Sequence, residues 1–222
     1  MIAGIQLKVC GLTSLVDAEA ADAIGADFLG FNLYPKSPRF VPLTHFASMR
    51  PQLPDRPKVA VMVTPTLAEL ETAVRAGFDF FQIHFPATES ASAIAASACA
   101  GRARTWLAPK LAPGETIDPA LLPLAQTWLL DAYRVEGYGG SGRTGDWAQF
   151  RRCRERHPGQ TWILAGGLGP ENVCAALAAT GATVIDVNSG VERLPGVKDP
   201  AQLAALRTAL ERAAPGREPK LR

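Results

Sequence analysis

One cysteine of this chain lies where it could do proton chemistry. Cys10 follows a short apolar run, and Lys8 lies two residues before it. In an extended strand their side chains therefore point to the same face. A nearby ammonium group favours the thiolate, which makes a base or a nucleophile feasible at Cys10. The alternative for a lone cysteine is a small, buried hydrophobic residue without reactivity.

Two glycine-bearing turns could bind an anion. Gly166 and Gly167 follow an apolar run and precede Pro170, which we expect close to the first position of a helix. In the run over 186–192, a turn with Asn188, Ser189 and Gly190 follows Asp186 and can present further N–H donors and a hydroxyl group. In (β/α)8 barrels the loops after the seventh and eighth strands frequently form a phosphate site. Each turn alone is ordinary, but the pair in this order predicts a phosphorylated small molecule as the ligand.

Two further loops carry candidate functional residues. Arg39 follows an apolar run, where its guanidinium could hold a carboxylate through two hydrogen bonds; alone, it would more often be a solvated surface charge. The run over 138–145 is rich in glycine but lacks the Gly-Lys-Ser/Thr ending of a nucleotide-binding loop. We expect it to form a mobile flap that excludes water, with a flexible connection as the alternative.

Repeated βα units must position these residues. Short β-branched or aromatic runs alternate with helical stretches along the whole chain. The expected strands span 5–10, 26–33, 58–63, 78–84, 104–110, 127–131, 161–165 and 183–187, and the clearest helices span 14–24, 66–76, 88–100, 170–180 and 199–213. Glycines expected to end helices are Gly25, Gly77, Gly101 and Gly181. The proline-bearing run over 112–124 is expected to be irregular or a short helix only.

The strand pattern predicts an α/β fold, a single-domain (β/α)8 TIM barrel. An open doubly wound sheet is the alternative, but no GxGxxG motif follows the first strand. A strand covered by helices should be apolar on its outer side, so its polar face points into the barrel. The residues placed there are Lys8, Cys10, Gln82, His84, Asp131 and Asp186. Because barrel active sites form at the C-terminal ends of the strands, we expect these side chains to share one mouth.

Composition limits the remaining possibilities. The 222 residues are 47% hydrophobic and 20% charged, which predicts one soluble globular domain over 1–222, with a polar tail over 215–222 that frays. The net charge of +2 and the lack of a basic block argue against a nucleic-acid partner. Without a signal sequence or a long apolar run, no membrane partner and a cytoplasmic location are expected. The four cysteines have no metal-ligand spacing, so no metal site is expected.

Five motifs in order resemble the phosphoribosylanthranilate isomerase family, and the resemblance covers essentially the whole chain. They are KVCGLT at 8–13, GF at 30–31 with SPRFV at 37–41, LD at 130–131 with GGSG at 139–142, AGGL at 165–168 and DVNSGVE at 186–192. The resemblance implies a (β/α)8 barrel that needs no cofactor. Its reaction would be the Amadori rearrangement of N-(5-phosphoribosyl)anthranilate to 1-(2-carboxyphenylamino)-1-deoxyribulose 5-phosphate, in tryptophan biosynthesis.

The resemblance also implies roles for single residues. Asp131 would be the general acid that protonates the furanose ring oxygen, and Cys10 the general base that removes the C2′ proton. Arg39 would bind the anthranilate carboxylate, and backbone groups around the two glycine-bearing turns would bind the phosphate. The residues expected to bind substrate are Arg39, His84, Gly166, Gly167, Asp186, Asn188, Ser189 and Gly190.

The chain departs from the family after the fourth strand. The family commonly has His-Gly there, whereas Phe85 and Pro86 follow His84 in this chain, and we expect them to narrow or reshape that side of the mouth. Two other functions remain open: an isomerase of another phosphosugar, as in the related histidine-pathway reaction, and a non-catalytic barrel that binds a phosphorylated ligand. The histidine-pathway chemistry resembles a two-aspartate arrangement, so Cys10 argues against it. Both a monomer and a homodimer fit the sequence.

Overall fold

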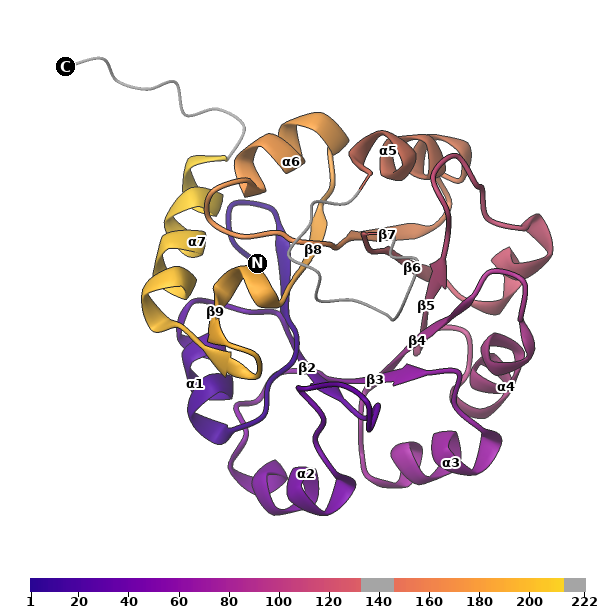
Figure 1. The fold of residues 1–222 in the computed structure, drawn as a ribbon, viewed down its shortest axis with the longest axis horizontal. Helices are drawn as coiled ribbons and strands as arrows, with labels where there is room; N and C mark the ends of the chain where they lie inside the picture. The colour runs from indigo at the N-terminus through magenta and orange to yellow at the C-terminus, as the bar shows by residue number, and fades with distance from the viewer. Residues whose placement is uncertain (133–145, 214–222) are drawn as a thin grey trace.

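Eight parallel strands form a closed barrel in the order β1 to β8, with β8 pairing back onto β1, in a computed structural model that describes residues 1–132 and 146–213. Seen in projection, the helices form a ring outside the strands (Figure 1). The predicted (β/α)8 TIM barrel is therefore confirmed. The predicted flap over 138–145 and the predicted frayed tail over 215–222 lie outside the described residues.

The elements follow the chain in simple alternation. The barrel strands are β1 Gln6–Val9, β2 Phe28–Asn32, β3 Lys58–Val63, β4 Phe80–Pro86, β5 Thr105–Lys110, β6 Thr127–Leu130, β7 Thr161–Leu164 and β8 Val184–Val187. The helices are α1 Leu15–Ala23, α2 Leu43–Met49, α3 Leu67–Arg75, α4 Ala91–Ala100, α5 Trp147–Arg156, α6 Val173–Thr180 and α7 Pro200–Arg212. Short 3-10 helices are η1 Arg50–Gln52, η2 Pro119–Leu124 and η3 Ser189–Val191, and a hairpin joins β9 Glu192–Leu194 to β10 Val197–Lys198.

The predicted strands agree with the observed ones to within two residues at each end, and two of the five predicted helices begin three residues later than expected. First, α4 begins at Ala91 and not at residue 88, and the sequence did not place α2 and α5 among the clearest helices. Second, α6 begins at Val173 and not near Pro170. The Asn172 side chain accepts the Gly169 N–H at 3.0 Å and donates to the Gly167 carbonyl at 2.8 Å. These bonds hold the preceding residues in a turn, which delays the helix.

Side-chain caps explain where several helices begin. The Thr66 hydroxyl and the Glu69 carboxylate cap the first turn of α3 reciprocally. Other helices are capped by a side-chain oxygen that accepts a backbone N–H, from Ser14, Asp146 and Asp199. At the other end of α6, Gly181 has φ 61°, as predicted, and its N–H donates to the Leu177 carbonyl at 2.8 Å.

Two hydrophobic layers fill the molecule. The larger layer lies between the strands and the helices and includes Leu7, Val9, Phe81 and Ile83. A smaller layer, here called the apolar layer, fills the barrel interior with Val59, Trp106, Ala108, Leu129, Ile163, Ala165 and Val184. Inward-facing residues further along four of the strands form what we call the polar layer, Cys10, His84, Asp131 and Asp186. The predicted alternation of strand faces is therefore confirmed.

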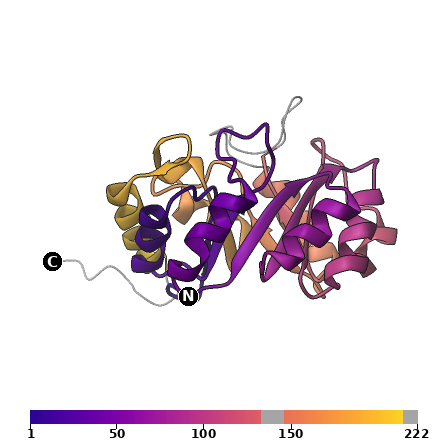
Figure 2. The ribbon, with the colours of Figure 1, turned by 90° about the horizontal axis from the view of Figure 1, so that it is seen from below.

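The polar layer lies at the end of the barrel away from the N-terminus. In the side view, the loop after β2 rises at that end, opposite the N-terminus (Figure 2).

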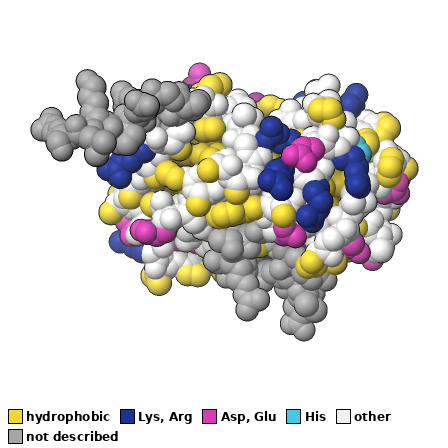
Figure 3. Space-filling model, turned by 90° about the horizontal axis from the view of Figure 1, so that it is seen from above, with side chains coloured by type: hydrophobic (Ala, Val, Ile, Leu, Met, Phe, Trp, Pro, Cys, Tyr) yellow, Lys and Arg dark blue, Asp and Glu magenta, His cyan; other side chains and the backbone are white. Residues whose placement is uncertain are grey.

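On the face drawn in Figure 3, basic side chains gather over α5 with acidic side chains among them. Arg151 lies 3.9 Å from Glu155 and Arg152 lies 3.8 Å from Asp146. Among the described residues, no helix has the length and apolar character needed to span a membrane.

Candidate active site

A cavity of about 370 Å³ opens at the C-terminal ends of the strands, a size typical of small-molecule sites. Nine of the ten predicted site residues line it: Cys10, Arg39, His84, Asp131, Gly166, Gly167, Asp186, Asn188 and Ser189. The exception is Gly190, whose Cα packs against the Leu168 carbonyl and Gly169. The structure thus brings the predicted residues into one mouth, and their individual roles stay predictions.

A buried ion pair joins β1 and β8 beside this cavity, which Asp186 of the pair lines. Lys8 and Asp186 are register partners on the two strands, and the Lys8 Nζ donates to Asp186 Oδ1 at 2.9 Å. The Lys8 side chain is fully buried. Burial alone would lower the pKa of Lys8, but Asp186 and Cys10 raise it above its ordinary value. The ion pair therefore favours the charged form of Lys8, beside Cys10.

The charge of Lys8 does not by itself make Cys10 a thiolate. Burial raises the pKa of the Cys10 thiol, the nearby Lys8 opposes this only in part, and Asp186 adds to the rise. The sequence-based expectation of an activated thiolate gave the correct sign for the effect of Lys8 but omitted the larger effect of burial. In this structure the thiol is protonated at neutral pH.

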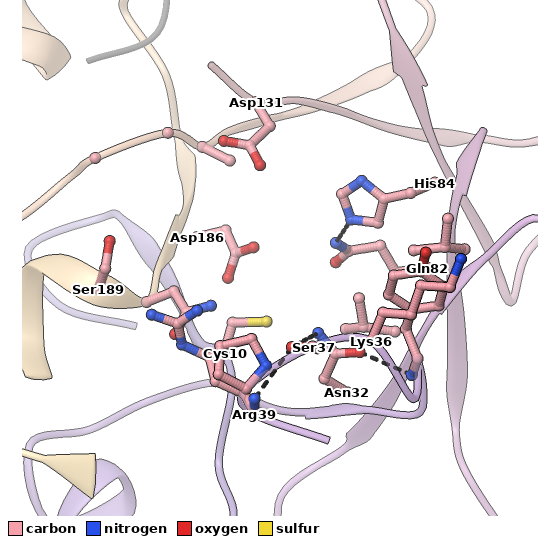
Figure 4. Close-up of a pocket in the computed structure, with 18 residues that line it drawn as sticks. Cys10, Asn32, Lys36, Ser37, Arg39, Gln82, His84, Asp131, Asp186 and Ser189 are labelled. Atoms are coloured by element: carbon pink, nitrogen blue, oxygen red, sulfur yellow. Dashed lines mark hydrogen bonds between the residues drawn. The ribbon is translucent and has the colours of Figure 1, made fainter. Parts of the chain in front are cut away.

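Asp131 lies across the cavity from Cys10 (Figure 4). Its Oδ1 accepts the N–H of Ala132 at 2.7 Å. Gly166 passes close by with φ 94°, and a Cβ added there would lie 2.5 Å from the Ala132 nitrogen and 3.1 Å from Asp131 Oδ1. Only glycine fits at this position, which places the loop after β7 directly beside the carboxyl group.

His84 lies on a third side of the cavity, and its ring is neutral. Burial, followed by the charge of Lys8, lowers its pKa to about 3. Its Nε2 lies 2.8 Å from the amide nitrogen of Gln82, which can donate to the neutral ring (Figure 4). Because His84 is uncharged, it can exchange neutral hydrogen bonds with a substrate but cannot pair with an anion as a cation.

Phe85 does not reshape the mouth, contrary to the expectation from the sequence. β4 continues to Pro86, so the alternation of faces turns Phe85 outward when His84 points inward. Phe85 is fully buried among the residues between the strands and the helices. The Phe85 side chain therefore extends the core and does not line the cavity.

The two glycine-bearing turns pack against each other at the cavity edge. A Cβ on Gly169 would lie 2.8 Å from the Gly190 carbonyl, so the turns meet backbone to backbone. Within residues 1–132 and 146–213, no hydrogen bond uses the N–H groups of Gly167 and Ser189. Such groups, together with the Ser189 hydroxyl, are suited to bind an anion. This edge is where the sequence predicts the phosphate site.

Arg39 is held by a partner that the sequence did not predict. Its Nε donates to both Glu192 carboxylate oxygens at 2.9 and 3.1 Å, and its Nη2 donates to Oε2 at 2.6 Å. Glu192 belongs to the 186–192 motif but received no role, and Lys198, which also contacts it, was not singled out. Asn32 was missed as well, although its place at the inward-facing end of β2 could have indicated it; its Nδ2 donates to the Ser37 Oγ at 3.0 Å.

The described residues offer no metal site. Within 1–132 and 146–213, no group of three or more His, Cys, Asp or Glu side chains could hold a metal ion. The chemistry available to the cavity from these residues is a thiol, a carboxyl group, a neutral imidazole, fixed cations and backbone N–H groups.

Comparison with known proteins agrees with this geometry. Residues 7–208 match the family model described as N-(5'phosphoribosyl)anthranilate (PRA) isomerase. The N-(5'-phosphoribosyl)anthranilate isomerase of Cereibacter sphaeroides is 38% identical over 221 residues, covering 94% of this chain and 100% of the relative. The crystal structure of TrpF from Jonesia denitrificans has a TM-score of 0.76 and 33% identity, covering 96% of this chain and 100% of that one. A phosphoribosyl anthranilate isomerase in complex with reduced 1-(o-carboxyphenylamino)-1-deoxyribulose 5-phosphate has a TM-score of 0.71 and 25% identity, covering 93% and 98%.

Proposed function

Because the chain belongs to the N-(5'-phosphoribosyl)anthranilate isomerase family, we propose that Cys10 and Asp131 are the base and the acid of its reaction. The chain is an isomerase that converts N-(5'-phosphoribosyl)anthranilate to 1-(2-carboxyphenylamino)-1-deoxyribulose 5-phosphate, a step of tryptophan biosynthesis. This rearrangement moves protons and electron pairs within one molecule. An acid and a base on opposite sides of the sugar therefore suffice for the chemistry.

The observation that carries the proposal is the position of Cys10 and Asp131 on opposite sides of one cavity (Figure 4). Asp131 gives its proton to the furanose ring oxygen, the C1′–O bond breaks, and a protonated Schiff base forms. Cys10 gives up its own proton to solvent, and the thiolate then takes the C2′ proton. The electron pair of that C–H bond neutralises the iminium to give an enolamine, which tautomerises to the ketone. Each group contributes roughly 10²- to 10⁴-fold to the rate.

The substrate itself helps to activate the base. Burial keeps the Cys10 thiol protonated, while Lys8 and Lys198 favour the thiolate. The protonated Schiff base adds a further positive charge on the nitrogen bonded to C1′, the carbon next to C2′, and a cation close to a thiol lowers its pKa. The thiolate is thus most stable at the step that needs it.

Substrate binding divides between two edges of the cavity. Arg39 binds the anthranilate carboxylate, and the N–H groups of Gly167 and Ser189 bind the phosphate with the rest of the two turns. Asp186, Asn188 and His84 contact the sugar part between them. This division follows from the two kinds of anion site that the cavity offers, a guanidinium and a row of backbone N–H groups.

The decay of anthranilate-type fluorescence tests the proposal, with freshly formed N-(5'-phosphoribosyl)anthranilate as substrate. We expect decay with the wild-type protein and, for Cys10→Ala, a turnover about 10²- to 10⁴-fold lower with an unchanged circular dichroism spectrum. Near-wild-type turnover by Cys10→Ala would remove Cys10 from the role of base. Tight binding of a product analogue without any turnover by the wild type would instead identify a non-catalytic barrel.

A further inference from the structure

A second group of buried charges lies beside the cavity, on the β9–β10 hairpin. Glu192 and Lys198 are register partners across the hairpin. The Lys198 side chain is 0% exposed, the Glu192 side chain is 4% exposed, and Lys198 Nζ lies 2.8 Å from Glu192 Oε1. Since the same carboxylate also receives the Nε and Nη2 donors of Arg39, one anion is shared between two cations.

This cluster keeps one positive charge that no described residue neutralises. The other partners of Lys198 Nζ are neutral, namely the carbonyl and the Oδ1 of Asn188, at 3.3 and 3.0 Å. Asp186 is paired with Lys8, and within the described residues no second carboxylate forms an ion pair with Arg39 or Lys198. Burial lowers the pKa of Lys198, as expected where one shared carboxylate only partly offsets it. An uncompensated buried charge is unfavourable, so the cluster favours a ligand anion.

The geometry directs that excess charge to the cavity. The bonds to Glu192 use Nε and Nη2 of Arg39, and no hydrogen bond within residues 1–132 and 146–213 uses Nη1. Arg39 lines the cavity on the same side as Cys10 (Figure 4). Gly11 permits this placement, because a Cβ there would lie 2.6 Å from Arg39 Cδ and 2.5 Å from Asn188 Oδ1.

We propose that Glu192 and Lys198 are positioning residues for the carboxylate of the substrate. Glu192 fixes the Arg39 guanidinium with its remaining edge toward the cavity. Lys198 offsets the charge of Glu192, so that the cluster retains one positive charge for the substrate carboxylate. This inference rests on the proposed function, in which Arg39 binds that carboxylate.

The test compares two ligands that both carry the phosphate. One is reduced 1-(2-carboxyphenylamino)-1-deoxyribulose 5-phosphate, and the other is the same compound without the carboxyl group. Calorimetry measures both on the wild type, on Lys198→Met, on Glu192→Gln and on the control Leu194→Ala, whose side chain is 64% exposed on the same hairpin. The ratio of the two affinities gives the contribution of the carboxylate to binding, because any disturbance of the phosphate site acts on both ligands.

We expect Lys198→Met and Glu192→Gln each to weaken the carboxylated ligand by about tenfold to a hundredfold, the range of a charge-assisted hydrogen bond. The carboxyl-free ligand should bind both variants nearly as it binds the wild type, and Leu194→Ala should leave the ratio unchanged. In turnover, KM should rise more than kcat falls. Equal losses for both ligands, or no loss for either, would show that the hairpin charges are structural only.

A double variant covers the case in which a single variant fails to fold. Glu192→Gln combined with Lys198→Met removes one charge of each sign and leaves the net charge of the cluster unchanged. We expect it to lose the preference for the carboxylated ligand, because Arg39 is no longer held. Full recovery of the preference would mean that net charge alone acts, and would refute positioning by Glu192. If the wild type shows the preference but no turnover, the proposed function fails and the inference about carboxylate binding stands.

Discussion

The apolar and polar layers of the barrel interior are built on the same strands, but the apolar layer stabilises the fold and the polar layer supplies the reactive groups. Leu129 and Asp131 lie two residues apart on the β6 side, and Val184 and Asp186 lie two residues apart on β8. The first member of each pair packs against hydrophobic neighbours, and the second lines the cavity. A strand can thus supply rigidity and chemistry from one face, because the apolar layer fixes the backbone that carries the polar one.

The two layers also contribute differently to the free energy of folding. Residues of the apolar layer gain stability on burial, by roughly 25 cal/mol per Å² of apolar surface. The polar layer instead buries a thiol, an imidazole and Asp186, which pairs with Lys8. Burial raises the pKa of Cys10 and lowers that of His84, whereas Asp186 and Cys10 raise the pKa of Lys8 against the effect of burial. We therefore expect substitutions in the two layers to separate activity from stability.

The largest expected effect comes from the polar layer, from Asp131→Asn. Asparagine keeps the shape and the oxygen that accepts the Ala132 N–H, but it has no carboxyl proton to give to the ring oxygen. We expect kcat to fall by about 10²- to 10⁴-fold with little change in the thermal midpoint. The fluorescence decay assay and a melting curve measure the two quantities. A large loss of stability with normal kcat per folded molecule would contradict the division between the layers.

Much of this division could be predicted from the sequence, because strand alternation is a local signal. Once a run is identified as a strand, the face that Cys10 shares with Lys8 follows from geometry, and so does the face that His84 shares with Gln82. The strand ends then place Asp131 and Asp186 at the same mouth. The helices were less certain where apolar residues are few, as in the charged α5, in which only Gln149, Phe150 and Cys153 are buried.

What could not be predicted depends on contacts between distant parts of the chain. Arg39 and Glu192 are 153 positions apart, and they meet through a hairpin of only three- and two-residue strands, too short for a periodic signal. The direction of the Cys10 pKa shift was equally inaccessible, because the proximity of Lys8 is visible in the sequence but the degree of burial is not. Partners and desolvation are properties of the folded molecule.

A substitution in the apolar layer should have the opposite effect to Asp131→Asn: it should lower stability and leave activity unchanged. The expected effect is also smaller. Leu129 is 1% exposed, and Leu129→Ala removes buried methyl and methylene groups from the barrel interior. We expect the free energy of unfolding to fall by about 2–5 kcal/mol, while kcat per folded molecule stays close to the wild-type value. Urea denaturation monitored by circular dichroism measures the first quantity, and active-site titration followed by turnover measures the second. A drop in kcat comparable to that of Asp131→Asn would mean that the apolar layer also sets the geometry of the acid.

The smallest expected effect is a dependence of stability on pH. It should come from the polar layer, because the apolar layer contains no group that titrates. His84 has a pKa of about 3 in the folded protein against an ordinary value of 6.5, so below pH 6.5 the unfolded chain binds a proton that the folded chain does not. Stability should therefore fall as the pH decreases, by roughly 1.4 kcal/mol per unit, or about 2 kcal/mol between pH 6.5 and pH 5. The measurement is the free energy of unfolding of the wild type minus that of His84→Gln at each pH, which cancels the contributions of the other groups. A difference that stays constant over this range would show that His84 is as readily protonated in the folded protein as in the unfolded chain, and that the polar layer is more hydrated than its burial implies.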